Sequence, residues 1–128
     1  HFKGVNDSLG HQAGDIALTS FANMLSENLG ENNIIGRFGG DEFIICFTHK
    51  SQSECEFLLE KIRLILEKTT FTLENGAQFS LTATFGVAHL KSEQIEQFDI
   101  NRLFEAADKA LYQAKQAGRN QICVLDAV

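Results

Sequence analysis

The feature that most constrains the fold is a pair of short apolar segments separated by Gly39-Gly40-Asp41-Glu42. The flanking residues 34–38 and 43–47 are rich in isoleucine and phenylalanine, which favour β-strands. A connection this short joins neighbouring antiparallel strands. The sequence therefore predicts a β-hairpin whose turn carries two glycines and two carboxylates.

Helical spacing of apolar residues predicts a helix on each side of this hairpin. The first covers residues 13–29 and ends before Gly30, a residue suited to the end of a helix. The second begins at a capping box formed by Ser53 and Glu56. Its buried face is predicted to consist of Cys55, Leu58, Leu59, Ile62, Ile65 and Leu66.

The second half of the chain predicts another hairpin, a helix and a last strand. Asn75-Gly76 is a favoured hairpin turn, here between a short strand at residues 71–73 and a longer one at 79–87. Apolar and polar residues alternate along the longer strand, so one of its faces is apolar. A third helix is predicted at residues 101–117 and a strand at 121–125.

Helices interleaved with strands and hairpins predict an α/β fold of the α+β sandwich type. We expect a mixed central β-sheet flanked by helices, with the first hairpin extending from it. The 128 residues suit one domain. Hydrophobic residues make up 44% and no run approaches the roughly 20 apolar residues of a membrane span. The sequence lacks a signal-peptide pattern, so we expect a cytoplasmic domain without membrane contact of its own, in a full-length protein that could be membrane-anchored.

Cysteine usage and charge exclude some classes of function. Cys46, Cys55 and Cys123 lie in separate apolar segments and form no CxxC pair, so we expect buried free thiols rather than disulfides or a metal site. The net charge of −6 argues against a general nucleic-acid binder. It is compatible with a phosphate-bearing small molecule held by a few local cations.

The turn of the first hairpin has a chemical interpretation and an ordinary one. Gly39 and Gly40 let the backbone bend tightly and let a ligand approach where no Cβ is in the way. The carboxylates of Asp41 and Glu42 suit a hard divalent cation such as Mg²⁺, which completes its shell with substrate phosphates. The alternative is a solvated turn, because glycine and aspartate are common in turns.

Four blocks, in order along the chain, resemble the GGDEF family of diguanylate cyclases. The five letters of residues 39–43 match the family signature without change. The other blocks are Phe2-Lys3-x-x-Asn6-Asp7-x-x-Gly10-His11-x-x-Gly14-Asp15, Phe85-Gly86-Val87-Ala88 and Ala107-Asp108-x-Ala110-Leu111-Tyr112-x-Ala114-Lys115-x-x-Gly118-Arg119-Asn120. Together they span nearly the whole chain. The resemblance implies a palm-like nucleotidyl-cyclase fold over residues 1–128.

The resemblance also implies an activity and its cofactor. Members condense two GTP molecules into the second messenger cyclic di-GMP with release of two pyrophosphates, each domain of a two-fold homodimer presenting one GTP. Asp41 and Glu42 would be the catalytic carboxylates and the ligands of Mg²⁺ or Mn²⁺. Which of the two acts as a general base, if either does, stays open at this point.

For the guanosine part of the substrate, the resemblance implies contacts in two segments. Asn6 and Asp15 match the guanine readers, and an amide with a carboxylate complements the edge of that base. His11 lies in the same segment and is expected near the substrate. Gly39 and Gly40 would leave room for the ribose and α-phosphate. Turn and helix-start roles are the ordinary alternative for Asn6 and Asp15.

The phosphates are expected to bind cations from both ends of the chain. The resemblance places Lys3, Lys115 and Arg119 around the triphosphate, with the backbone near Phe2 and Lys3 donating N–H groups. An ordinary alternative exists for Lys115 and Arg119, since the helix dipole favours cations near a helix C-terminus.

Two departures from the family pattern carry expectations of their own. In relatives, an Asp-x-Asp strand with a metal-binding carboxylate comes just before the position of Phe2, where this sequence begins. We therefore expect a longer polypeptide that supplies the N-terminal helix and first strand, with an N-terminal sensor or regulatory domain. Many relatives also have Arg-x-x-Asp where this chain has Gly30-Glu31-Asn32-Asn33. Without that arginine, we expect weak or no feedback inhibition by cyclic di-GMP.

The main alternative to an enzyme is a catalytically silent GGDEF domain that binds GTP or acts as a regulatory or dimerisation module. The intact signature at residues 39–43 favours the enzyme. A cyclase acting on ATP conflicts with Asn6 and Asp15 as guanine readers.

Overall fold

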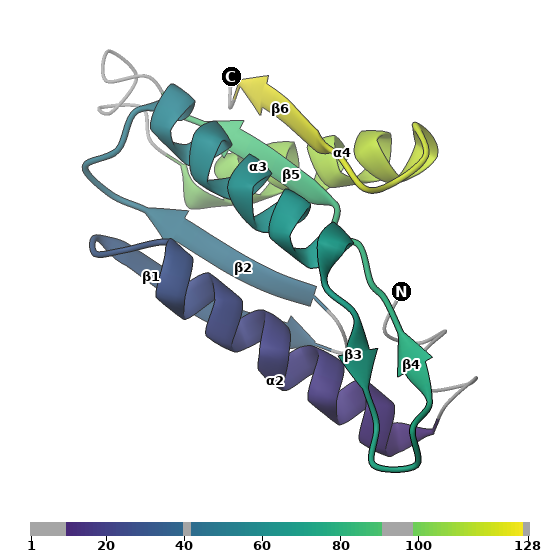
Figure 1. Cartoon of the computed structure of the whole chain (residues 1–128). Helices are drawn as coiled ribbons and strands as arrows, with labels where there is room; N and C mark the ends of the chain where they lie inside the picture. The colour runs from purple at the N-terminus through teal and green to yellow at the C-terminus, as the bar shows by residue number, and fades with distance from the viewer. Residues whose placement is uncertain (1–9, 40–41, 91–98, 127–128) are drawn as a thin grey trace. The chain divides into compact units, whose positions relative to one another are not determined.

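The computed structural model describes residues 10–39, 42–90 and 99–126. The chain divides into two compact units, His1–Thr82 and Ala83–Val128. The first holds α2 (His11–Asn28), β1 (Asn33–Gly39), β2 (Glu42–Phe47), α3 (Gln52–Lys68), β3 (Phe71–Thr72) and β4 (Gln78–Phe79) (Figure 1). The second holds β5 (Phe85–His89), α4 (Ile100–Gln116) and β6 (Ile122–Asp126).

The first predicted hairpin is confirmed by the pairing of β1 with β2. The two strands are antiparallel, and their register runs from Asn33 opposite Phe47 to Gly39 opposite Glu42. The register is irregular between Arg37 and Gly39. The last pair leaves only residues 40–41 to connect the strands.

Helix α2 contacts this hairpin through an aromatic pair. It begins at His11, two residues before the predicted start, and its C-cap is Leu29, whose N–H donates to the Leu25 carbonyl at 3.0 Å. Gly30 follows with φ of 70°, a conformation that favours glycine, so the predicted stop is confirmed. The ring of Phe21 meets that of Phe43 edge to face, with centroids 5.3 Å apart.

The start predicted for α3 is wrong by two residues. Ser51 is the N-cap, and its hydroxyl accepts the Glu54 N–H at 3.2 Å, so Ser53 and Glu56 form no capping box. The predicted face is largely confirmed: Cys55, Leu59, Ile62 and Leu66 are buried. Ile65 is an exception, because it lies on the exposed side of the helix.

The second predicted hairpin is confirmed at its turn but not along its second strand. Gly76 has φ of 85°, and the N–H of Leu73 donates to the Ala77 carbonyl at 2.8 Å. The rings of Phe71 and Phe79 stack across β3 and β4, 5.1 Å apart. Residues 80–84 are not a strand, so the continuous strand predicted at 79–87 is wrong. Its two ends pair with different partners, β4 with β3 and β5 with β6.

In the second unit, β5 and β6 are parallel neighbours and α4 packs against both. The helix is capped by Asp99, whose carboxylate accepts the Asn101 N–H at 2.9 Å. Gly86 on β5 lies directly against the backbone of the helix. A Cβ at this position would be 2.2 Å from the Leu111 nitrogen and 2.4 Å from the Ala107 carbonyl oxygen. Only glycine allows β5 and α4 to approach this closely.

The α+β class is confirmed, although the described strands form three two-stranded sheets rather than a single mixed sheet. No helix in the described ranges is long and apolar enough to cross a membrane. The expectation of buried thiols is confirmed for Cys55 and wrong for Cys46, which is exposed. Cys123 is partly exposed.

We expect Gly86→Ala to destabilise the protein by about 1–3 kcal/mol, because the new methyl group meets helix backbone that cannot rotate away. Urea denaturation followed by circular dichroism measures the change. Gly36→Ala is the matched control, since nothing lies within 4 Å of a Cβ built there. Equal unfolding midpoints for the two variants would contradict the close contact.

The thiols of Cys46 and Cys55 should react at different rates. Burial raises the pKa of Cys55, and the nearby carboxylates of Glu54 and Glu56 add to this while Lys50 opposes it. A raised pKa leaves less thiolate, the reactive form, at a given pH. We expect iodoacetamide to alkylate Cys46 before Cys55 in the folded protein, as followed by peptide mass spectrometry. The difference should vanish in denaturant; a difference that persists there would not come from the fold.

Candidate functional site

The alternation of side chains along β2 determines which face of the first hairpin carries Glu42. Exposed and half-buried residues alternate from Glu42 to Phe47. Phe43 points toward α2, where it meets Phe21, so Glu42 must lie on the opposite, exposed face. Its Cα is opposite that of Gly39 in the last pair of the hairpin. Gly40 and Asp41 lie outside the described residues, and their roles stay predictions.

His11 and Asp15 lie one helical turn apart near the start of α2, and both are exposed. Residues four apart share one face of a helix. The opposite side, with Ala13 and Ala17, is buried. The N-cap is Gly10, which has no side chain to cap the helix, and Asp15 lies beyond the first turn. The ordinary role of Asp15 as a helix-start residue is therefore not what the structure shows.

Helix α2 and strand β1 run in opposite directions, and the N-terminal end of α2 extends beyond the point where β1 ends (Figure 1). The start of α2 therefore lies toward the turn end of the hairpin, where Gly39 is opposite Glu42. Phe2, Lys3 and Asn6, which precede the helix, lie outside the described residues.

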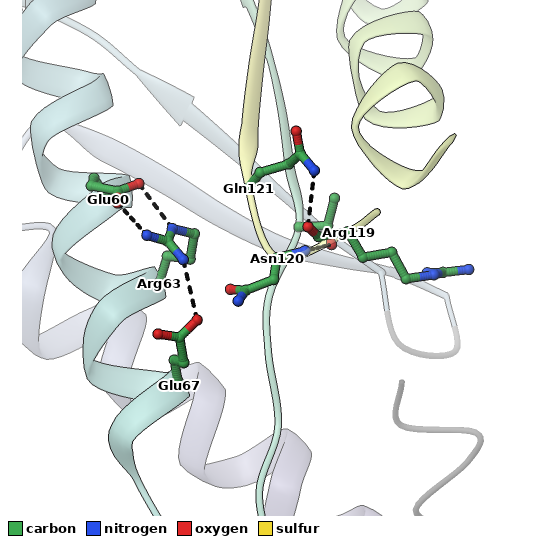
Figure 2. A network of polar contacts seen from close by, with 7 residues as sticks. Glu60, Arg63, Glu67, Arg119, Asn120 and Gln121 are labelled. Carbon is green, nitrogen blue, oxygen red and sulfur yellow. Dashed lines mark hydrogen bonds and ion pairs between the residues drawn. The ribbon is translucent and has the colours of Figure 1, made fainter. Parts of the chain in front are cut away.

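The predicted phosphate-binding cations lie at the C-terminal end of α4. Lys115 is half-buried in the last turn, and Arg119 is exposed in the turn that follows. Residues 109–125 contain no aspartate or glutamate, so these cations have no carboxylate near them in sequence. Arg119 itself has φ of 62° and its N–H donates to the Ala114 carbonyl at 3.0 Å. Its side chain extends away from that of Asn120 (Figure 2).

Arg63 on α3, unlike Arg119, has glutamates close to it in the sequence and pairs with them. Its guanidinium binds the carboxylate of Glu60 and, at 3.4 Å, that of Glu67 (Figure 2). Hydrogen bonding to Arg63 lowers the pKa of Glu60 and raises that of Arg63. An arginine engaged in this way is a poor candidate for binding phosphate, which agrees with its absence from the predicted site.

The structure thus places the predicted residues in three groups. His11 and Asp15 share a helix face, and Gly39 and Glu42 form the last pair of a hairpin. Lys115 lies in the last turn of α4, and Arg119 lies in the turn that follows the helix. The first two groups belong to the first unit and the third to the second. The pocket that all three are predicted to share stays a prediction.

Metal binding at the hairpin rests on the chemistry of its donors. In the part of the chain that the structure describes, no three His, Cys, Asp or Glu side chains cluster so as to hold a metal ion. Glu42 is the one predicted ligand within that part. Its exposed carboxylate fits Mg²⁺, which ordinarily takes one or two carboxylates and fills its other positions with water and phosphate oxygens.

One residue of the site region escaped the sequence analysis. Thr84 was expected only as a polar position of a continuous strand, whereas its hydroxyl accepts the backbone N–H of Asn120 at 3.0 Å. The partners are 36 residues apart in the chain. No local sequence pattern predicts a bond between residues this far apart. The signal that was present is a threonine directly before an apolar strand.

Comparison with known proteins gives a consistent result. The family profile described as diguanylate cyclase, GGDEF domain, matches residues 1–121. A curated relative, the diguanylate cyclase DosC of Escherichia coli, is 37% identical over 121 residues, which is 94% of this chain and 25% of the relative. The chain therefore spans about a quarter of the length of that protein.

Solved structures agree with the sequence relatives. The GGDEF domain of DgcB from Caulobacter crescentus, in complex with c-di-GMP, superposes with a TM-score of 0.88 at 29% identity, over 97% of this chain and 71% of that one. The active GGEEF domain of a diguanylate cyclase from Vibrio cholerae gives 0.80 at 31% identity, over 97% and 76%. The palm-like fold expected from the sequence is thereby confirmed.

Proposed function

The chain belongs to the GGDEF family of diguanylate cyclase domains, and we propose that it is an active member that converts two GTP molecules into cyclic di-GMP. One observation carries the proposal: the signature at residues 39–43 is intact and ends a hairpin in which Glu42 is exposed while Phe43 packs inward. In this proposal, residues 1–128 form one GGDEF domain.

The reaction joins two nucleotides by two equivalent steps. In each step, the 3′-oxygen of one ribose bonds to the α-phosphorus of the other GTP, the bond between the α- and β-phosphates breaks, and pyrophosphate leaves. The hydroxyl proton departs toward the acidic pair Asp41 and Glu42. The same carboxylates hold Mg²⁺ or Mn²⁺, which neutralises charge on the phosphates.

The other residues orient the nucleotide. Asp15 and Asn6 hydrogen bond to the guanine edge with His11 nearby, and Gly39 and Gly40 leave space for the ribose. Exposure of Asp15 on the same helix face as His11 supports this assignment.

The triphosphate is bound by Lys3, Lys115 and Arg119 together with backbone N–H groups near Phe2. The absence of aspartate and glutamate from residues 109–125 supports this assignment, because no carboxylate that neighbours Lys115 or Arg119 in the sequence competes with an anionic ligand.

A single domain presents one GTP, so the proposed reaction requires a homodimer with two-fold symmetry. The E. coli relative is about four times as long as the matched region, which supports a sensor or regulatory domain in the full-length protein. We place the domain in the cytoplasm, where GTP is available, and expect no nucleic-acid partner for a chain of net charge −6.

The acidic pair is tested by incubating full-length protein with GTP and Mg²⁺ and quantifying cyclic di-GMP and pyrophosphate. We expect Asp41→Ala to lower the rate by roughly 100-fold or more, because metal stabilisation of the phosphate charge is worth several kcal/mol. Glu74→Gln, an exposed carboxylate in the second hairpin, should leave the rate unchanged. Wild-type protein that binds GTP without turning it over would contradict the proposal and identify a silent, regulatory domain.

Product inhibition through residues 30–33 should be weak or absent. Where many relatives have a charged Arg-x-x-Asp, Asn33 donates its side-chain amide to the Gly30 carbonyl at 2.8 Å, and neither end offers a guanidinium for a phosphate. We expect the initial rate to be insensitive to added cyclic di-GMP. Submicromolar binding of cyclic di-GMP that is weakened by substitution of Asn33, measured by calorimetry, would contradict this expectation.

A further inference from the structure

The turn between α4 and β6 has an unusual backbone. Gly118, Arg119 and Asn120 have φ values of 118°, 62° and 50°, so three successive residues lie at positive φ. Glycine adopts this region freely and asparagine tolerates it, but an arginine there has a Cβ that crowds the backbone. Such a conformation persists only where surrounding contacts hold it.

Hydrogen bonds from both sides of this turn hold it in place. The Arg119 N–H donates to Ala114 at 3.0 Å, and the Gln121 side-chain amide donates to the Arg119 carbonyl at 3.0 Å (Figure 2). The Phe85 N–H donates to the Gln121 carbonyl at 2.9 Å. A further bond runs from the Asn120 N–H to the Thr84 hydroxyl at 3.0 Å, so a side chain from outside the turn also holds it.

We propose that Thr84 is a positioning residue for nucleotide binding. By accepting the Asn120 N–H, its hydroxyl holds the preceding residue, Arg119, in the left-handed conformation and so aims the guanidinium at the phosphates of GTP. This inference rests on the proposed function, because it assigns Thr84 a task at the same site.

Thr84 is well placed to do this because its own backbone is anchored. It directly precedes β5, whose ladder with β6 begins where Phe85 lies opposite Ile122. The hydroxyl therefore has a fixed position relative to the turn, and it is half-buried. Valine has the same shape but cannot accept a hydrogen bond, so Thr84→Val removes the bond from the Asn120 N–H to residue 84. The turn can then relax and the arginine loses its fixed direction.

A merely structural role for Thr84 has different consequences. It would lower stability without acting through Arg119, and any kinetic effect would be independent of that arginine. A double-mutant cycle separates the two roles, since residues that act as a unit give non-additive effects.

The experiment uses full-length protein with Mg²⁺ and measures KM and kcat for GTP, and the dissociation constant for GTP. Wild type is compared with Thr84→Val, Thr84→Ser, Arg119→Ala and the double variant Thr84→Val with Arg119→Ala. Thr82→Val, an exposed threonine of the same segment, is the matched control. Thermal unfolding of each variant shows whether it is folded, and Thr84→Ala replaces Thr84→Val if the valine variant is not.

We expect Thr84→Val to raise KM about three- to tenfold, the usual worth of one hydrogen bond, with kcat nearly unchanged. Thr84→Ser should retain wild-type KM because it keeps the hydroxyl. In the Arg119→Ala background, Thr84→Val should have no further effect. Unchanged KM in Thr84→Val, or a full additional loss in the double variant, would overturn the proposal.

Failure of the proposed function is distinguishable from failure of this inference. If wild type binds GTP but forms no cyclic di-GMP, the cyclase assignment is wrong. The double-mutant cycle of Thr84→Val and Arg119→Ala then still tests this inference, through the dissociation constants for GTP. If wild type does not bind GTP, both proposals are overturned together.

Discussion

The close contact between Gly86 and α4 determines the geometry of the second unit. Because backbone meets backbone there, with no side chain as a spacer, the helix has one position on the strand. The parallel pairing of β5 with β6 then fixes where the chain must return after the helix. The turn that carries Arg119 connects the end of α4 to the start of β6. Thr84, just before β5, accepts a hydrogen bond from the backbone of this turn at Asn120.

Much of the fold was predictable because its helices and turns have local causes. The 3.6-residue period located α2 and α4, and Asn75-Gly76 located the second turn. The start of α3 was not decided by local sequence, since Ser51 and Ser53 each precede a glutamate by three residues. The strand predicted at residues 79–87 failed because alternation indicates the face on which a residue lies, not the strand with which it pairs.

The candidate site divides in the same way between local and distant causes. The exposure of Glu42 follows from its neighbour Phe43, and the shared face of His11 and Asp15 follows from their spacing. The bond between Thr84 and Asn120 has no such local cause, because folding alone brings the two residues together across 36 positions. Sequence reasoning therefore predicted which groups contact a nucleotide, and these assignments stay predictions, but it did not predict the hydroxyl that bonds to the turn carrying Arg119.

A chain with net charge −6 needs a way to keep its cations available to an anionic ligand. Arg63, with glutamates three residues before and four after it, is bound by both. Arg119 lies in a stretch without carboxylates, from residue 109 to 125. Its backbone is also held at an angle that an arginine does not favour. The sequence around Arg119 lacks glutamates like those that bind Arg63, and the bonded turn constrains the backbone that carries the guanidinium, so the two features together suit an arginine that binds phosphate.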